Sequence, residues 1–181
     1  MKIIASAALL LVAVLSGVQE PHTASDPSAA HPAAAQQSAS EMVPDVYSIP
    51  VHVDRMVILR LKFDTDLLAG IERMTKQENI RNGVIVSGIG SVRGYQIDQV
   101  TSRDLPSKTT VESNPTSPAE LVGMNGYIIG GRVHAHITLA TPEKAIAGHL
   151  QQNTRVLTCA IVTIAVMNDA NFARIDDQTY R

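Results

Sequence analysis

The segment Gly130–Leu150, GGRVHAHITLATPEKAIAGHL, predicts a β-hairpin that carries three of the chain's six histidines. Residues 133–140 alternate between apolar and polar side chains, as a strand with one buried face does. The sequence TPEK, residues 141–144, is a turn signal and predicts a four-residue hairpin loop before a second short strand. The segment therefore indicates antiparallel pairing within a sheet.

The register of this hairpin decides where its histidines lie. A four-residue loop pairs Ala140 with Ala145, and counting outward places His136 opposite His149. One face then collects an apolar set that suits a core: Ala135, Ile137, Leu139, Ile146 and Leu150. The other face collects His134, His136, Thr138, Ala147 and His149. Opposed Cβ atoms lie about 4.5–5.5 Å apart, so three imidazoles can converge on one point.

Three neutral imidazoles around one point suit a divalent transition metal, with Zn²⁺ first and Ni²⁺, Fe²⁺ or Mn²⁺ as alternatives. Three protein ligands leave one coordination position open, which is the catalytic rather than the structural arrangement. The competing interpretation is a polar sheet face that is solvated or lies at a subunit contact. The hypothesis is a metal site at His134, His136 and His149, with catalytic residues unknown and no general base assigned.

The rest of residues 46–168 predicts a single α+β domain. Residues 56–63 predict a strand, and residues 64–79 predict one main amphipathic helix, capped by Asp64 or Thr65, with an apolar face of Leu67, Leu68, Ile71 and Met74. A polar loop is expected at residues 101–118. Because most strands follow one another without a helix between them, the sheet should be largely antiparallel. The further strands are expected at residues 82–90, 94–100, 120–131, 133–140, 144–150 and 154–167.

The two ends of the chain predict segments outside this domain. Residues 1–18 carry Lys2 and an apolar run from Ile3 to Leu15, the pattern of a signal peptide, with an uncleaved anchor as the alternative. Residues 19–45, rich in Ala, Ser and Pro, predict a flexible linker, and residues 169–181 a polar C-terminal tail. We therefore expect an exported protein, periplasmic or secreted, with no membrane association after cleavage.

Composition argues against a nucleic acid partner. The formal charge is -2, no basic run stands out, and the chain has no Trp and two Phe. We therefore expect neither a positive electrostatic field that would hold a phosphate backbone nor an aromatic surface on which bases would stack. Cys159, without a partner in the chain and with apolar neighbours, is expected to be a buried core thiol.

Several other residues invite a functional interpretation. GIGSVRG, residues 88–94, superficially resembles a dinucleotide-binding loop, but the segment after it predicts a strand rather than a helix. We interpret its glycines as a tight turn or as close packing between strands, with Arg93 either solvated or in contact with an anion.

Surface positions are expected for Glu112, Glu120, Glu143 and His52.

The motifs IRNGVIVSGIGSVRG, ELVGMNGYIIGGRVHAHITLA and AGHL resemble the prokaryotic branch of the plants and prokaryotes conserved (PPC) domain family, over about Val53–Met167. The resemblance implies a compact α+β domain with a strongly bent sheet that assembles as a homotrimer. It also places His134, His136 and His149 on the family's histidine positions. Plant relatives join this domain to AT-hooks and act on DNA. This chain has no R-G-R-P hook, so we do not expect that role here.

The fold implied by this resemblance is similar to that of acetolactate decarboxylase, whose zinc is held by an H-x-H pair and a later histidine. The order of HAH and His149 matches that pattern, although the spacing differs. This similarity makes metal-assisted chemistry on a small carbonyl or carboxylate compound one expectation. The other is a non-enzymatic trimeric module that presents a binding surface to a partner.

Overall fold

The computed structural model describes residues 46–172 and residue 175. The predicted signal peptide (residues 1–18), the predicted linker (residues 19–45) and residues 173–174 and 176–181 of the predicted tail lie outside the described residues. Among the residues described, no helix is long and apolar enough to cross a membrane. The elements, in chain order, are β1 (Arg55–Lys62), α2 (Leu67–Gln77), β2 (Gly83–Val100), β3 (Thr109–Asn114), β4 (Ala119–Ile129), β5 (Arg132–Ala140), β6 (Ala145–Leu150) and β7 (Arg155–Val166).

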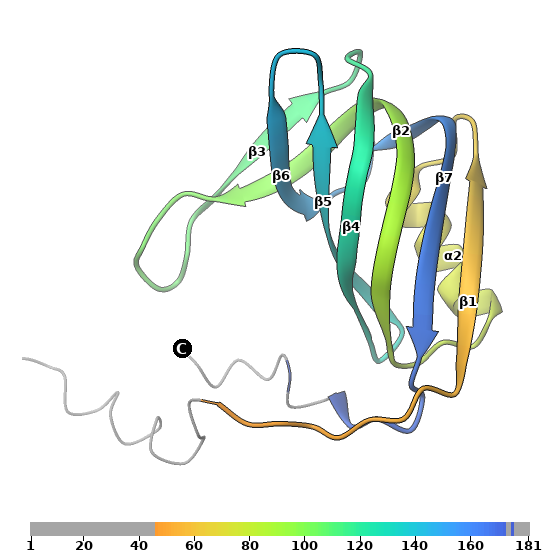
Figure 1. Ribbon diagram of the computed structural model, residues 1–181. Coiled ribbons are helices and arrows are strands. Elements are labelled where there is room, and N and C mark those ends of the chain that lie inside the picture. Colours follow the sequence, from red (N-terminus) through yellow and green to blue (C-terminus); the bar gives the residue numbers. More distant parts are fainter. Residues whose placement is uncertain (1–45, 173–174, 176–181) are drawn as a thin grey trace, which may run out of the picture.

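The strands form one seven-stranded sheet in the order β1-β7-β2-β4-β5-β6, and β3 pairs with β2 beside this path. All strand pairings in this part of the chain are antiparallel. The first part of β2 pairs with β7 and β4, whereas its end pairs with β3 and β6. β2 therefore follows the strong bend of the sheet, which Figure 1 shows as the long strand that leaves the main layer. The predicted α+β class and largely antiparallel sheet are confirmed.

The prediction of two strands separated at residues 91–93 is wrong. The strand is continuous from Gly83 to Val100, with bulges between Gly90 and Val92 and between Val92 and Gly94. Gly90 has a φ of 153°, and a Cβ there would overlap the carbonyl oxygen of Cys159. The glycines of GIGSVRG thus serve close packing between strands and not a tight turn.

A second correction concerns the predicted polar loop at residues 101–118. Residues Thr109–Asn114 form β3, which pairs with Tyr95–Val100 at the end of β2. The side chains of β3 are exposed or half-buried, so the segment lacks the apolar alternation that identifies a half-buried strand. β3 forms because its backbone pairs with β2. The local sequence of residues 109–114 does not specify that pairing.

The helix α2 begins one or two residues later than the capping prediction placed it. Asp66 is the N-cap residue, and its carboxylate accepts hydrogen bonds from the backbone N–H of Ala69 at 3.0 Å and of Asn153 at 2.7 Å. Asp64 instead has a φ of 62° in the preceding turn. The predicted apolar face is confirmed, because its residues are buried or pack against the core: Leu67, Leu68, Ile71 and Met74.

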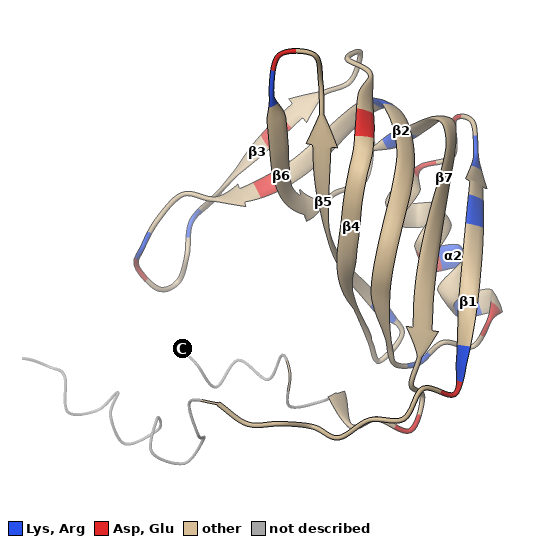
Figure 2. Cartoon of the chain, in the orientation of Figure 1, with Lys and Arg blue, Asp and Glu red and all other residues tan. Residues whose placement is uncertain are grey.

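The main core lies between α2 and the bent sheet, and strands from both ends of the sheet contribute to it. Figure 1 shows no helix on the opposite face of the sheet within the described residues. Apolar side chains are exposed there: Met56, Ile58, Val86, Ile89, Val122 and Ile161. Figure 2 shows few charged residues along β2, β4 and β7. Cys159, predicted to be a buried thiol, is only half-buried in β7.

Candidate metal centre

The hairpin β5–β6 has the predicted register. Ala140 pairs with Ala145, and the pairing continues through Leu139 with Ile146, Thr138 with Ala147 and Ile137 with Gly148 to His136 with His149. The predicted apolar face is buried at Ala135, Ile137, Leu139 and Leu150, and Ile146 is partly buried. The loop at residues 141–144 is closed by a hydrogen bond from the backbone N–H of Thr141 to the carbonyl oxygen of Lys144 at 2.8 Å.

The three histidines meet on the other face of the hairpin. One ring nitrogen from each of His134, His136 and His149 lies within 4.8 Å of the others. The Nε2 atoms of His134 and His136 are 3.3 Å apart. Two imidazole nitrogens bound to one tetrahedral zinc ion at about 2.0–2.1 Å lie roughly 3.3 Å apart. The 3.3 Å spacing of the pair from β5 is therefore one that two ligands of a single metal ion can have, and the ring of His149, perpendicular to both, completes a group that could hold a metal ion.

The electrostatics of the cluster favour neutral imidazoles. Burial, followed by the charge of His134, lowers the pKa of His136 below its ordinary value. The pKa of His149 is also lowered, first by burial and then by His134 and His136, while Asp98 acts in the opposite direction. Because a metal binds only the neutral imidazole, these shifts favour the ligand form of both rings.

Asp98 lies next to the cluster through a contact between distant strands. The end of β2 pairs with β6 so that Asp98 is opposite His149. A Cβ on Gly148 would lie 2.5 Å from the carbonyl oxygen of Asp98, so this approach of β6 to β2 requires glycine. The carboxylate of Asp98 accepts a hydrogen bond from Gln151 Nε2 at 2.7 Å. The sequence interpretation missed Asp98 because nothing local indicates that β2 reaches β6.

β4 supports the cluster from the other side. Asn125 is paired with His136, and Tyr127 with His134. Between them, Gly126 has a φ of 157°, and a Cβ there would overlap the carbonyl oxygen of His134. β4 and β5 therefore approach each other closely at the point where β5 presents its two histidines.

The other candidate residues lie apart from the three-histidine cluster. Glu112 forms an ion pair with Lys144 at 2.9 Å. Arg93 lies 3.5 Å from the carboxylate of Asp64, and its guanidinium lies 5.2 Å from the ring centre of Phe63, so its contacts are within the protein. His52 is exposed before β1, and the remaining acidic candidates, Glu120 and Glu143, are exposed at strand ends or loops. No general base is identified among them.

Comparison with known proteins identifies the family. The sequence profile of the Plants and Prokaryotes Conserved (PCC) domain, the PPC domain named above, matches residues 50–168. This chain belongs to the PCC domain family. The motifs that suggested the family lie within the matched range, and so do His134, His136 and His149.

Solved structures share the PCC fold. A metal-containing protein from Archaeoglobus fulgidus, AF0104, aligns with a TM-score of 0.59 and 22% identity over 69% of this chain and 89% of its own. A plant- and prokaryote-conserved protein from Pyrococcus horikoshii aligns with a TM-score of 0.56 and 22% identity over 67% and 85%. The expected likeness to acetolactate decarboxylase is weaker: the enzyme from Bacillus subtilis aligns with a TM-score of 0.43 and 12% identity over 72% and 67%.

Among curated proteins, this chain resembles part of a much longer protein. It is 27% identical over 120 residues to the bifunctional protein GlmU of Synechococcus sp. (strain JA-2-3B'a(2-13)). The match covers 66% of this chain but 18% of that protein. This chain therefore spans about a fifth of the length of the curated relatives that it matches.

Proposed function

We propose that this PCC-domain protein binds a divalent transition metal through His134, His136 and His149. The observation that carries the proposal is the convergence of three imidazole nitrogens within 4.8 Å, two of them 3.3 Å apart. A solvated polar face would not require a third histidine opposite the H-x-H pair. Nor would a solvated face account for the lowered pKa values of His136 and His149, which favour the neutral imidazole that binds a metal.

Zinc is the first candidate for this metal. An all-imidazole ligand set suits zinc, with nickel, iron and manganese as alternatives. The description of the Archaeoglobus protein as metal-containing supports a metal in this fold, and we extend that to this chain as part of the proposal.

We further propose that the metal acts on a small molecule. Three protein ligands leave a coordination position for a substrate oxygen or water, and a bound zinc ion polarises a carbonyl or lowers the pKa of water. The chain's own contribution is to bring three imidazoles to one point, with Asp98 opposite His149 in the pairing of β2 with β6.

The second candidate function is a trimeric interaction module without catalysis, and the exposed apolar face of the sheet favours it. Met56, Ile58, Ile89 and Ile161 are 39–71% exposed, and contiguous exposed apolar surface of this kind marks interaction sites. We propose that this face is covered by other copies of the chain in a homotrimer.

We also propose that the protein is exported, because Lys2 and the apolar run Ile3–Leu15 have the pattern of a signal peptide. N-terminal sequencing of protein from fractionated cells tests this. A mature chain that begins after about Ser16, recovered outside the cytoplasm, is the expected result. Intact Met1 in the soluble cytoplasmic fraction would contradict it.

The metal proposal is tested by elemental analysis of protein purified without added metal or chelator, followed by X-ray absorption at the edge of the metal found. We expect close to one ion per chain, with three nitrogen ligands at about 2.0–2.1 Å if the metal is zinc. The His136→Ala variant, purified in parallel, should contain little metal. Equal metal content in the variant and the wild type would overturn the assignment.

A further inference from the structure

A cavity of about 790 Å³ opens beside the three histidines, between the second half of α2 and the turn that joins β4 to β5. Its volume lies within the range of sites for small molecules, about 300–1,000 Å³. Both His134 and His149 line it, so a molecule in this cavity lies next to the proposed metal.

The charges that line the cavity are mostly positive. Lys76, Arg81 and Arg132 contribute three cations against the single carboxylate of Glu72. Neither guanidinium is paired with a carboxylate among residues 46–172 and 175. Each presents free N–H groups in a planar fork, the geometry that binds a carboxylate through two hydrogen bonds.

The backbone holds these two arginines at the same end of the cavity. The carbonyl oxygen of Arg81 accepts a hydrogen bond from the N–H of Gly131 at 2.8 Å, which ties Arg81 to the residue before Arg132. The N–H of Arg81 donates to Asn168 Oδ1 at 2.8 Å. These hydrogen bonds hold the segment after α2 against the start of β5, so the side chains of Arg81 and Arg132 branch from neighbouring stretches of backbone.

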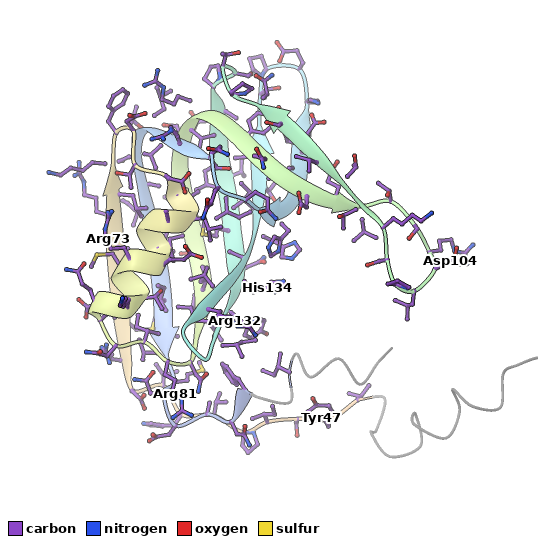
Figure 3. The ribbon with its side chains drawn as sticks, turned by 180° about the vertical axis from the view of Figure 1, so that it is seen from behind. Tyr47, Arg73, Arg81, Asp104, Arg132 and His134 are labelled. Atoms are coloured by element: carbon purple, nitrogen blue, oxygen red, sulfur yellow. The ribbon has the colours of Figure 1, made fainter. Side chains whose placement is uncertain are left out.

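Arg132 lies on the same face of β5 as His134. Alternation along a strand puts residues 132, 134 and 136 on one side, and neighbouring side chains of one face are about 6.6 Å apart along the strand. Figure 3 shows Arg132 next to His134, with Arg81 farther toward the same end of the molecule. A ligand of a few atoms therefore spans the distance from the imidazoles to Arg132.

An unpartnered hydroxyl provides an independent indication of a polar ligand. Thr75 of α2 lines the cavity and is 1% exposed, and its Oγ1 has no hydrogen-bond partner within the described part of the chain. A buried hydroxyl without a partner is destabilising, so such groups are normally satisfied by protein, water or ligand. Its O–H is a donor suited to an anionic oxygen.

We propose that this cavity binds a small carboxylate, whose anionic end is held by Arg132 and Arg81 while an oxygen at its other end reaches the metal. The inference rests on the proposed metal site for that second contact, but the cationic end of the cavity is a separate feature. The proposed substrates of the site are therefore short organic acids that carry a second oxygen donor, and not neutral compounds of the same size.

Calorimetric titration of the zinc-loaded, dialysed full chain tests this with three probes. Malonate supplies a carboxylate and a second oxygen donor, malonamide has the same size without charge, and inorganic phosphate represents the other common oxyanion. We expect malonate to bind at least about tenfold more tightly than malonamide, because charge-assisted hydrogen bonds to a guanidinium are worth about that factor. Malonate should also bind more tightly than phosphate.

The variants R132Q and R81Q should each weaken malonate binding about tenfold while the zinc content stays at the wild-type level. R73Q is the matched control, because Arg73 is an exposed arginine of α2 that does not line the cavity. It should bind malonate as the wild type does. Zinc content is measured on every sample, so loss of the metal is not mistaken for loss of the anion site.

Each outcome separates the two proposals. If malonate and malonamide bind alike, or if R132Q and R81Q match R73Q, the carboxylate site is overturned and the zinc content alone decides the metal site. If the protein holds no zinc but malonate binding still depends on both arginines, the metal proposal fails and the carboxylate site stands. Tighter binding of phosphate than of malonate would overturn the assignment to carboxylates.

Discussion

His136 of β5 lies directly opposite His149 of β6, and the ring centres of His134 and His149 are 4.7 Å apart across the same pair of strands. The candidate ligand set is therefore a property of one hairpin and its register. A one-residue slip would move every side chain of a strand to the other face and separate the histidines. Changes that move β5 or β6 should affect metal binding even where they touch no histidine.

Replacing Gly126 by alanine is the first such change. The new Cβ would overlap the carbonyl oxygen of His134, and the φ of 157° disfavours any residue except glycine. We expect Gly126→Ala to lower the free energy of unfolding by about 2 kcal/mol and to weaken metal binding. Urea unfolding and metal titration of the same sample measure both effects.

Gly123→Ala is the control for this prediction, since Gly123 lies on the same strand and a Cβ added there would meet no atom within 4 Å. Its stability should stay within about 0.5 kcal/mol of the wild type. Equal losses in the two variants would show that the close approach at Gly126 has no special role.

The metal-free protein should lose stability as the pH falls below about 6.5. Burial and the neighbouring imidazoles lower the pKa values of His136 and His149, so the folded state takes up their protons less readily than the unfolded chain does. Stability is then fully present above the unfolded value of about 6.5 and decreases below it, toward the lowered folded values. Urea unfolding at pH 7.5 and 5.5 measures the difference, and His149→Asn should make it smaller. An unchanged difference in that variant would contradict the explanation.

Removing the charge of Asp98 should shift His149 in a known direction. Asp98 raises the pKa of His149 against the larger effect of burial, so Asp98→Asn should lower that pKa further. An NMR titration of the metal-free protein measures it. At pH 7.5 we also expect metal affinity to fall several-fold, because a negative charge beside the site attracts a divalent cation. Glu112→Gln, which removes the partner of Lys144, should leave both quantities unchanged; a matching loss there would point to a general charge effect.

The hairpin was predictable because its information is local. The TPEK loop fixes the pairing of Ala140 with Ala145, and the alternation that follows selects one register for His136 and His149. The same alternation would have placed Arg132 on the histidine face. By contrast, Asp98 reaches His149 only through the pairing of β2 with β6, strands that are distant in sequence. β3 was missed because its sequence, TTVESN, has no buried face.

The proposed trimer should depend on the exposed apolar face of the sheet. Ile89 is 57% exposed at the centre of that face, opposite Ile161 of β7. We expect Ile89→Asp to convert a particle of about three chains into a monomer, because burying an unpaired carboxylate in an apolar contact is strongly unfavourable. Light scattering measures the mass. Val111→Asp, at an equally exposed position on β3, should remain trimeric. A wild-type monomer at micromolar concentration would refute the trimer.

The most direct test of the central claim is a metal titration of the wild type and of four single variants at pH 7.5 and 5.5. Replacing His134, His136 or His149 by alanine should each weaken zinc binding far more than His52→Ala, because His52 is exposed before β1 and outside the cluster. Binding by the wild type should weaken at pH 5.5, where protons compete for the imidazoles. Equal, weak binding by all five proteins would contradict the metal site and leave the interaction module as the function of this domain.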